Sequence, residues 1–393
     1  MVTITDQNPT MPEVLALYKS VGWSMYTRDP ARLERALTHS LMVLGAYEGK
    51  QLVGLIRAVG DGETILFIQD LLVLPEYQRR GIGKQLIEAF DIIDSKNVNG
   101  NSVASYLKSI KQDADIQVYP LVGPKGSTDM LKIRIPGLHG KTSGGDAPTI
   151  GLLGRLGGLG ARPERIGYVS DGDGALVAIA LAAKLLDMQN KGDFLEGDVF
   201  ISTHICPDAP TAPHVPVPFM GSPVEMAQVN AEELTPELDA VLSVDTTKGN
   251  RVINHNGFAI SPTVKEGYIL RTSEDLLDLM QITTGKLPKV FPLTQQDITP
   301  YGNDLHHLNS ILQPATATNA PVVGIAITTE TTVPGCATGA SHMTDLDEAA
   351  RFMLEVAKSF GSRSLKLYDE EEFEKLQSLY GSMNHFQKLN PFS

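Results

Sequence analysis

The first ninety residues change from a helical to a strand-like pattern of apolar positions. Val14, Leu17 and Tyr18 are spaced as i, i+3 and i+4, which is typical of an amphipathic helix. Asp29-Pro30 predicts the start of a second helix, because aspartate caps helix N-termini and proline fits the first helical position. Apolar runs separated by turn pairs follow over 42–75 and indicate an antiparallel meander.

From Asp91 onward, apolar runs of strand length alternate with longer helical stretches. The strand candidates are KIRIPG, RIGYVS, GDVFIST, DAVLSVD and APVVGIAIT, and the helical candidates are 175–188, 273–282 and 344–360. This alternation is typical of a mostly parallel sheet with helices on both faces. We therefore predict two domains: an incomplete α+β module over 1–90 and a three-layer α/β/α domain over 91–393.

Composition and charge narrow the class of partner. Hydrophobic residues make up 42% of the 393-residue chain, as in ordinary globular proteins, and the formal net charge of −13 argues against nucleic acid or an anionic membrane surface. Two cysteines are too few for a disulfide framework, the N-terminus lacks a signal-peptide pattern, and no apolar run approaches the roughly 20 residues that span a bilayer. We expect a cytoplasmic protein that binds small molecules or peptides, and a homo-oligomer is compatible with this composition.

The stretch VLPEYQRRGIGKQL, from Val73 to Leu86, joins a strand to a helix through a glycine-bearing loop. Pyrophosphate is bound by converging backbone N–H groups at a helix N-terminus, and Gly81 and Gly83 would let the main chain approach it closely. IQDLLVLPEYQRRGIGKQL resembles the acetyl-CoA motif of the GNAT acetyltransferases. The alternative is a structural helix cap that has a similar sequence.

The resemblance implies where acetyl-CoA would bind. The pantetheine arm would pair with the backbone of Leu72, Val73 and Leu74, and the pyrophosphate would be held by Arg79, Arg80, Gly81, Ile82, Gly83 and Lys84. Asp70 would be the base for the acceptor amine, or else an ordinary turn or edge residue of its strand. The resemblance ends near Phe90, whereas a complete GNAT domain continues into a further strand, a helix and a hairpin that form the other wall of the cleft.

The segment from about Asp91 to the C-terminus resembles a bacterial family known as domain of unknown function 1177. The resemblance rests on two long passages, GLHGKTSGGDAPTIGLLGRLGGLGARPERIGYVSDGDGA and STHICPDAPTAPHVPVPFMGSP. The family name supplies no reaction. The function of this segment must therefore be inferred from its residues.

The order of polar residues in this segment is similar to that of the dinuclear zinc aminopeptidases. Those enzymes present a histidine after a strand, an aspartate that opens a helix, a glutamate pair, a strand-terminal aspartate and a late histidine, all groups that zinc binds well. The matching residues here are His139, Asp171 or Asp173, Asp245 and His342. The resemblance implies a divalent metal, with zinc as the first choice, at the carboxyl edge of the sheet.

The glutamate pair is absent, and His204 of VFISTHICPD stands in its place. An imidazole there would be a further ligand or a base near neutral pH. Each residue also has an ordinary structural explanation, because loop histidines are commonly hydrogen-bonded and Asp171 and Asp173 could cap the following helix.

Three functions therefore fit the sequence. The first is acyl transfer from acetyl-CoA to a small amine, which rests on the most specific motif but on an incomplete domain. The second is metal-dependent hydrolysis of a peptide or related amide, which rests on the larger domain but with an altered base. The third is a non-catalytic binding protein for a small molecule or peptide, with a vestigial GNAT segment.

Overall fold

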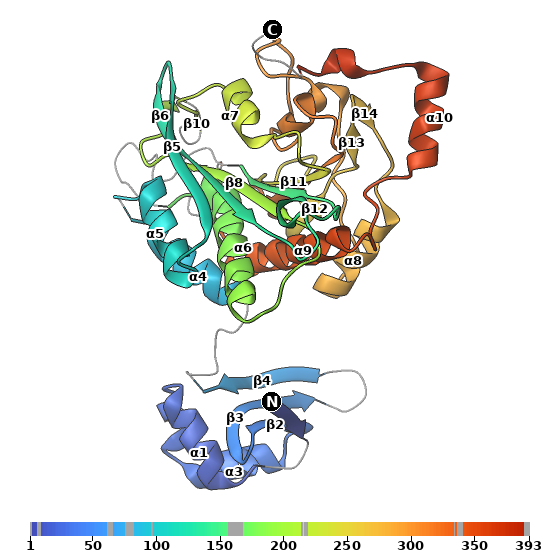
Figure 1. Cartoon of the computed structure of the whole chain (residues 1–393). Coiled ribbons are helices and arrows are strands. Elements are labelled where there is room, and N and C mark those ends of the chain that lie inside the picture. Colours follow the sequence, from blue (N-terminus) through green and yellow to red (C-terminus); the bar gives the residue numbers. More distant parts are fainter. Residues whose placement is uncertain are drawn as a thin grey trace. The chain divides into compact units, whose positions relative to one another are not determined.

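The chain forms two compact units, Met1–Arg80 and Gly81–Ser393, in the computed structural model (Figure 1). The structure describes residues 2–5, 9–60, 66–74, 82–95, 97–155, 168–213, 215, 219–333, 335 and 341–388. Each unit contains its own buried hydrophobic cluster. The division falls between Arg80 and Gly81, ahead of the boundary at residue 90 that the sequence suggests.

Unit 1, Met1–Arg80, is an antiparallel sheet with helices packed on it. Its elements are β1 (Val2–Thr5), α1 (Met11–Ser20), α2 (Ser24–Thr27), α3 (Pro30–Thr38), β2 (Met42–Glu48), β3 (Gln51–Gly60) and β4 (Leu66–Val73). The strands pair in chain order, as expected of a meander. Asp29 accepts a hydrogen bond from the Arg32 amide at 3.0 Å and caps α3. Val14, Leu17 and Tyr18 are buried in the core of the unit.

Unit 2, Gly81–Ser393, is built on one large mixed sheet. Its strands are β5 (Asp115–Gly123), β6 (Gly126–Ile135), β7 (Ile150–Gly154), β8 (Val199–Ile205), β11 (Ala240–Thr246), β12 (Gly257–Ile260), β13 (Val264–Lys265), β14 (Tyr268–Ile269) and β15 (Val322–Thr328). The order is β14-β13-β15-β11-β7-β8-β6-β5, and β12 also pairs with β15. Neighbours from β15 to β8 are parallel, and the flanking strands are antiparallel. The predicted α/β class is confirmed.

The central strand β7 has no counterpart among the strand candidates of the sequence, because it is short and rich in glycine. Its last residue, Gly154, lies against the backbone of α6, since a Cβ atom there would meet the Gly174 carbonyl oxygen at 2.4 Å. A Cβ at Gly174 would in turn meet the Arg155 carbonyl oxygen at 2.3 Å. The two glycines therefore bring the first turn of α6 directly onto the end of β7.

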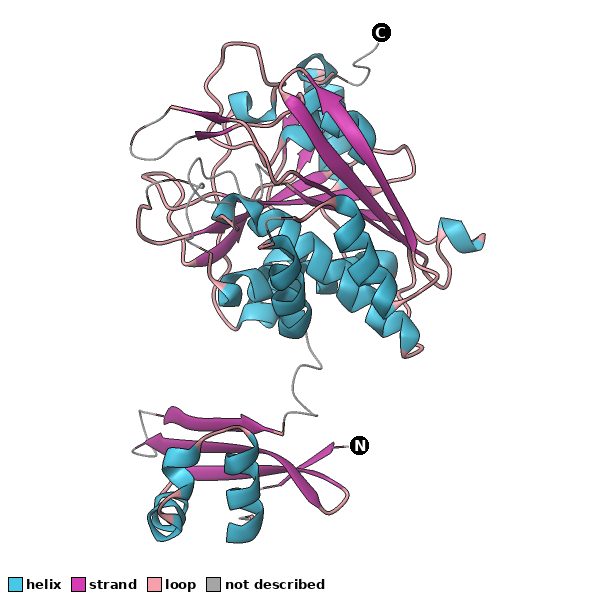
Figure 2. Cartoon of the chain, turned by 90° about the vertical axis from the view of Figure 1, so that its left-hand side faces the viewer, coloured by secondary structure: helices cyan, strands magenta, loops and turns pink. Residues whose placement is uncertain are grey.

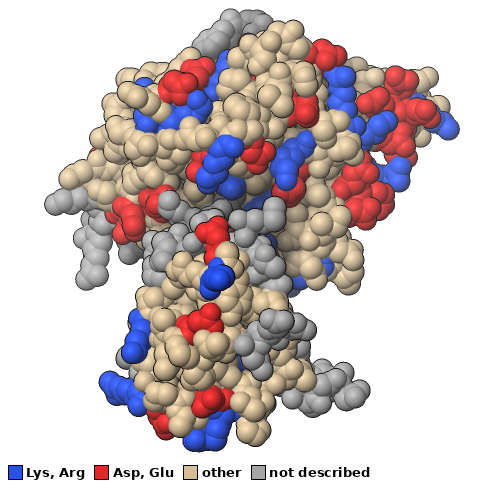
Figure 3. All heavy atoms as spheres, turned by 60° about the horizontal axis from the view of Figure 1, so that its bottom comes forward, with Lys and Arg blue, Asp and Glu red and all other residues tan. Residues whose placement is uncertain are grey.

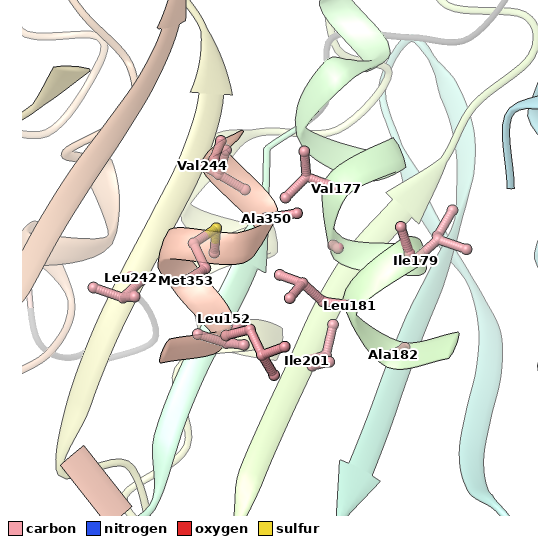
Figure 4. Close-up of a cluster of buried hydrophobic side chains, with 14 of the residues drawn as sticks. Leu152, Val177, Ile179, Leu181, Ala182, Ile201, Leu242, Val244, Ala350 and Met353 are labelled. Carbon is pink, nitrogen blue, oxygen red and sulfur yellow. The ribbon is translucent and has the colours of Figure 1, made fainter. Parts of the chain in front are cut away.

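One face of the sheet is covered by a layer of helices (Figure 2). These helices are α4 (Ile82–Ile93), α5 (Gly100–Ile110), α6 (Asp173–Asn190), α8 (Glu274–Thr284) and α9 (Met343–Gly361). α6 is buried along most of its length and contacts both the sheet and the neighbouring helices. Figure 4 shows Val177 and Leu181 of α6 beside Met353 of α9 and the strand residues Leu152 and Ile201.

The other face of the sheet carries a thinner layer than the predicted third layer of helices. Its cover includes α7 (Met226–Glu233) and the 3₁₀ turns η4 (Gln295–Ile298) and η5 (Gln313–Thr316). Small elements complete the unit: β9 (Thr211–Ala212), β10 (Phe219–Met220), α10 (Glu370–Tyr380), η2 (Lys141–Ser143), η3 (Ser170–Gly172) and η6 (Asn384–Phe386).

Helix α4, which the GNAT resemblance assigns to the N-terminal module, packs within unit 2. It contacts α6 and α9, and Ala89 and Ile93 lie in the main core of that unit. The Phe90 ring meets the Tyr168 ring edge to face, with 5.0 Å between centroids. The apolar side of this helix is therefore packed in the hydrophobic core of unit 2.

Charged side chains of both signs are interspersed on the face shown in Figure 3. Among the described residues, no helix combines the length and apolar character that crossing a bilayer requires. The expectations of a cytoplasmic location and of no nucleic-acid partner stay predictions.

Candidate active site

The parallel strands of unit 2 bring polar residues together at their carboxyl edge. Leu153 of β7 lies beside Ser202 of β8, and Gly154 lies beside Val244 of β11. Side chains two residues apart on a strand share a face, so Arg155, His204 and Asp245 follow on the same face of three neighbouring strands. This row is the start of the candidate site.

Asp173 adds a buried carboxylate at the first residue of α6. It accepts hydrogen bonds from the Tyr168 hydroxyl at 2.7 Å and from the Ser341 hydroxyl, and it pairs with the Lys248 ammonium at 2.9 Å. Both oxygens are thus engaged by donors from separate segments. Asp173 organises this edge of the sheet instead of merely capping a helix.

Two further carboxyls at this edge, Asp171 and Asp245, have pKa values that burial raises. Loss of solvation on burial raises the pKa of Asp171 to about 8, with further contributions from the charges of Asp245 and Asp173. Burial raises the pKa of Asp245 to about 6, partly offset by hydrogen bonds from the Thr246 amide at 2.7 Å and the Ser310 hydroxyl at 3.0 Å. With a pKa of about 8, Asp171 therefore holds a proton at neutral pH.

Two cations that the sequence pattern does not single out complete the cluster. The Arg155 guanidinium lies 2.8 Å from Glu233 of α7, with the two side chains 3% and 0% exposed, and also donates to the Asn230 side chain at 2.7 Å. Lys248 follows β11 and pairs with Asp173. The available signal is local: Arg155 directly follows the apolar strand IGLLG, and Lys248 closely follows Asp245 in DAVLSVDTTK.

His204 lies at this edge and is almost fully buried. Its Nδ1 is 2.9 Å from the Thr128 hydroxyl of β6, and the same hydroxyl donates to the Ile205 carbonyl. The structure thus places four of the residues predicted for a site in this segment at the same edge of the sheet, namely Asp171, Asp173, His204 and Asp245.

His139 does not join them, which corrects the assumption that its strand is parallel. β6 is antiparallel to β8, so the chain leaves β6 at the amino edge of the parallel strands. There the His139 amide donates to the Glu196 carbonyl at 3.0 Å, and its 71% exposed imidazole lies 2.5 Å from the Glu196 carboxylate. This edge is opposite to the one that holds Asp245.

His342 precedes α9 and its imidazole is 64% exposed, with Nδ1 3.4 Å from Asp345. Its neighbour Ser341, not His342 itself, contacts Asp173. Among the residues that the structure describes, no group of three or more His, Cys, Asp and Glu side chains is arranged to hold a metal ion. The predicted zinc ligands therefore do not fit one zinc site in this arrangement, because one is remote, one points to solvent and Asp173 is bound by lysine.

In unit 1, Asp70 is buried inside the core instead of facing a cleft. It accepts hydrogen bonds from the Tyr18 hydroxyl at 2.6 Å and from the Arg57 guanidinium, and it is 1% exposed. Burial raises the pKa of Tyr18, and the hydrogen bond to Asp70 raises it further. The geometry agrees with a structural role for Asp70 and not with a base that reaches an acceptor amine.

The remaining residues of the predicted acetyl-CoA site are only partly visible. The side chains of Leu72 and Leu74 lie in the core of unit 1, and β4 pairs with β3 alone among the described strands. Arg79, Arg80 and Gly81 lie outside the described residues. Ile82, Gly83 and Lys84 form the start of α4, whereas their side chains and that of Val73 are not described.

Comparison with known families gives two matches along the chain. Residues 121–390 match the family described as protein of unknown function (DUF1177), and residues 9–93 match the acetyltransferase (GNAT) family. An uncharacterized N-acetyltransferase ycf52-like protein of Prochlorococcus marinus is 35% identical over 79 residues, which cover 19% of this chain and 43% of that relative. The chain thus spans less than half the length of this relative.

Two solved structures are similar to parts of the chain. A GNAT-family acetyltransferase from Streptococcus pneumoniae TIGR4 is 47% identical with a TM-score of 0.19, over 22% of this chain and 64% of that chain. A glutaminyl cyclase from an Acidobacteriales bacterium is 14% identical with a TM-score of 0.43, over 72% of this chain and 94% of that chain. At these scores the likenesses assign no activity to the large unit.

Proposed function

The chain belongs to the family described as protein of unknown function (DUF1177), and from that premise we propose that unit 2 is a hydrolase of amide bonds in peptides or related small molecules. The feature that supports the proposal is the presence of two carboxyls at the carboxyl edge of the sheet, Asp171 before α6 and Asp245 near the end of β11, whose pKa values burial raises to about 8 and about 6. At pH 7 the first carboxyl is protonated and the second is mostly ionised. A pair of carboxyls whose pKa values are pushed apart supplies an acid and a base.

In the proposed reaction, ionised Asp245 accepts a proton from a water molecule whose oxygen attacks the amide carbon. Protonated Asp171 donates its proton to the amide nitrogen, the carbon–nitrogen bond breaks, and the products are a carboxylic acid and an amine. Return of the proton from Asp245 to Asp171 through solvent restores the pair. The positive charge of Arg155 lowers the pKa of Asp245 and so helps to keep this base ionised.

An amide is the favoured substrate class because an amine leaves only after its nitrogen is protonated. An acid with a pKa near 8 keeps its proton at neutral pH and releases it with little penalty, which suits this leaving group. The proposal contains no step through zinc, because Asp173 is bound by Lys248 and neither His139 nor His342 contributes its imidazole to the cluster.

The pH dependence of hydrolysis tests this pair. We expect kcat/KM to rise with pH around 6, as Asp245 loses its proton, and to fall around 8, as Asp171 loses its own. The measurement is hydrolysis of a panel of aminoacyl and peptidyl 4-nitroanilides from pH 4 to pH 10. Activity that keeps increasing up to pH 10 would exclude Asp171 as the acid.

The second proposed function is acyl-CoA binding by the segment that matches the GNAT family, residues 9–93. The sequence motif Gly81-Ile82-Gly83 at the start of α4 supports it, because backbone N–H groups at a helix N-terminus bind pyrophosphate. The proposed ligand is acetyl-CoA and the acyl acceptor a small amine. The matched segment covers less than half of the length of the acetyltransferase relatives. Catalysis by this segment is therefore a separate question from binding.

Acetyl-CoA is expected to bind, and replacing Gly81 and Gly83 by valine is expected to weaken the binding roughly tenfold or more, since side chains would keep the pyrophosphate from the amides. Titration calorimetry with acetyl-CoA measures this, with Lys50→Val in the exposed β2–β3 turn as the control. If the unaltered chain binds no acetyl-CoA, the GNAT-like segment is a vestige that has lost acyl-CoA binding.

A further inference from the structure

The loop over 299–310 is closed on itself by side-chain hydrogen bonds and reaches the candidate site. At its far end, the Ser310 hydroxyl donates to the Asp245 carboxylate at 3.0 Å. The buried Asp297 carboxylate fastens the same end, because it accepts a hydrogen bond from the Leu308 amide at 2.7 Å. The place of Ser310 beside the proposed base therefore depends on how this loop is held.

His307 joins two parts of the loop through both of its ring nitrogens. Its Nδ1 is 3.0 Å from the Leu305 carbonyl oxygen, and its Nε2 is 3.0 Å from the Thr299 carbonyl oxygen. A carbonyl oxygen only accepts hydrogen bonds, so each contact needs an N–H group on the ring. Neutral imidazole has one N–H group and the imidazolium has two, so only the charged ring satisfies both contacts.

The Thr299 hydroxyl does not provide the neutral ring with an alternative. Its oxygen is 3.2 Å from Nε2 of His307, but it donates to the Gln296 carbonyl at 2.8 Å and accepts from the Asn303 side chain at 2.9 Å. A neutral ring in this position would turn the lone pair of one nitrogen toward a carbonyl oxygen. One of the two contacts of the ring would then open.

The titratable groups around the imidazole belong to the loop and to η4. The Tyr301 ring lies 4.6 Å from it between centroids, and loss of solvation is the main reason that the pKa of this phenol is raised to about 12, so it stays neutral. Asp297 belongs to η4, Asp304 and His306 are exposed members of the loop, and η5 contributes the neutral side chain of Gln313. Among these residue types, histidine is the one that changes charge between about pH 5 and 8.

We infer that His307 is a pH-sensitive latch of the loop over 299–310. The protonated ring holds the loop closed with Ser310 against Asp245, and loss of the proton releases the loop. Closure is thus supported while the ring is charged, and this support is lost as pH rises. The inference rests on the proposed function in one respect, because the site that the latch regulates is the one that contains the proposed base Asp245.

Amide hydrogen exchange of the full chain, followed by mass spectrometry of its peptides, tests the latch. Protection, the intrinsic exchange rate at each pH divided by the observed rate, is expected to be roughly tenfold or more lower over 299–310 at pH 8 than at pH 5.5, the effect of losing a hydrogen bond from a charged donor. His307→Gln, which has one amide donor group at either pH, should show equal protection at both. His306→Gln is the matched control, because His306 is the exposed neighbour, and it should keep the pH dependence of the unaltered chain.

Equal protection of the loop at the two pH values in the unaltered chain would overturn the inference. So would a pH dependence that His307→Gln retains or that His306→Gln loses. Helix α9 is the internal reference, and an equal loss of protection there would mean that the whole unit opens, which also counts against the latch. If His307→Gln does not fold, the comparison of the loop with α9 in the unaltered chain still decides. Exchange needs no substrate, so failure of the latch and failure of the proposed hydrolysis are distinguished.

Discussion

Replacing either Asp171 or Asp245 by asparagine is expected to lower kcat/KM for amide hydrolysis by about two to four orders of magnitude, the range that a positioned acid or base contributes. Asparagine keeps the shape of the side chain, but it neither holds a transferable proton nor accepts one. Loss of Asp245 should remove the limb of the pH profile near 6, and loss of Asp171 the limb near 8.

Asp187→Asn is the control for this pair, because Asp187 lies on α6 with its carboxylate paired to Lys191 near the surface. Its activity should stay within about twofold of the unaltered chain, since changes at surface pairs have small effects. Full activity in Asp171→Asn or Asp245→Asn would contradict the proposed acid and base.

Stability should change in the opposite direction to activity. A carboxyl whose pKa is raised in the folded state binds more protons there than in the unfolded state, so its contribution to stability falls as pH increases from about 4 to the folded pKa. For Asp171 that range extends to about 8. Asp171→Asn should therefore unfold at a higher temperature than the unaltered chain at pH 8, with a smaller difference at pH 5, as expected where a site trades stability for function.

The apolar pattern predicts the elements of the fold better than their directions. Runs such as GDVFIST and DAVLSVD become β8 and β11, because short apolar runs of strand length suit a sheet interior that is buried on both faces. The apolar pattern does not predict β7, because β7 has glycine instead of a branched residue where α6 packs on it. Its packing partner cannot be read from the strand itself.

The direction of a strand depends on what it pairs with, and this decides where His139 lies. KIRIPG reads equally well as a parallel or an antiparallel strand. In the structure β5 and β6 form a hairpin that closes between Gly123 and Gly126 and adds to β8 in the antiparallel sense. That reversal moves His139 to the amino edge, whereas the truly parallel strand β11 delivers Asp245 to the predicted edge.

The sequence predicts the carboxylates and His204 of the candidate site but not its cations. Asp171, Asp173 and Asp245 stand at strand ends and helix starts, where a pattern of carboxylates can be recognised in the sequence. Arg155 and Lys248 belong to no motif, and a lysine or arginine is exposed in most sequence contexts. Their burial follows from the carboxylates that surround them, which only the assembled fold reveals.

The second prediction with a large expected effect concerns the stability of unit 2 and rests on the buried ion pair of Arg155 and Glu233. Arg155→Ala is expected to lower the free energy of unfolding of unit 2 by about 3–5 kcal/mol, because Glu233, itself 0% exposed, is left without its countercharge. Urea unfolding followed by far-UV circular dichroism reports on both units. The fluorescence of Trp23, the single tryptophan of the chain, reports on unit 1 alone and should not shift.

Arg134→Ala is the matched control for this prediction. Arg134 pairs with Glu237 at the same 2.8 Å distance, but the two side chains are 35% and 52% exposed, so its loss should cost about 1 kcal/mol or less. Arg155→Met combined with Glu233→Met should recover most of the stability that Arg155→Ala loses, since apolar side chains of similar size need no countercharge. An equal cost for Arg134→Ala and Arg155→Ala would mean that burial does not determine the strength of the pair.

The loss in Arg155→Ala should also depend on pH, because burial raises the pKa of Glu233 and the charge of Arg155 counteracts it. Without the arginine, the folded state keeps Glu233 protonated over a wider pH range, and stability falls as pH rises through that range. The difference between the variant and the unaltered chain should therefore be larger at pH 8 than at pH 5. A difference that is independent of pH would indicate that lost packing, and not the unpaired carboxylate, causes the destabilisation.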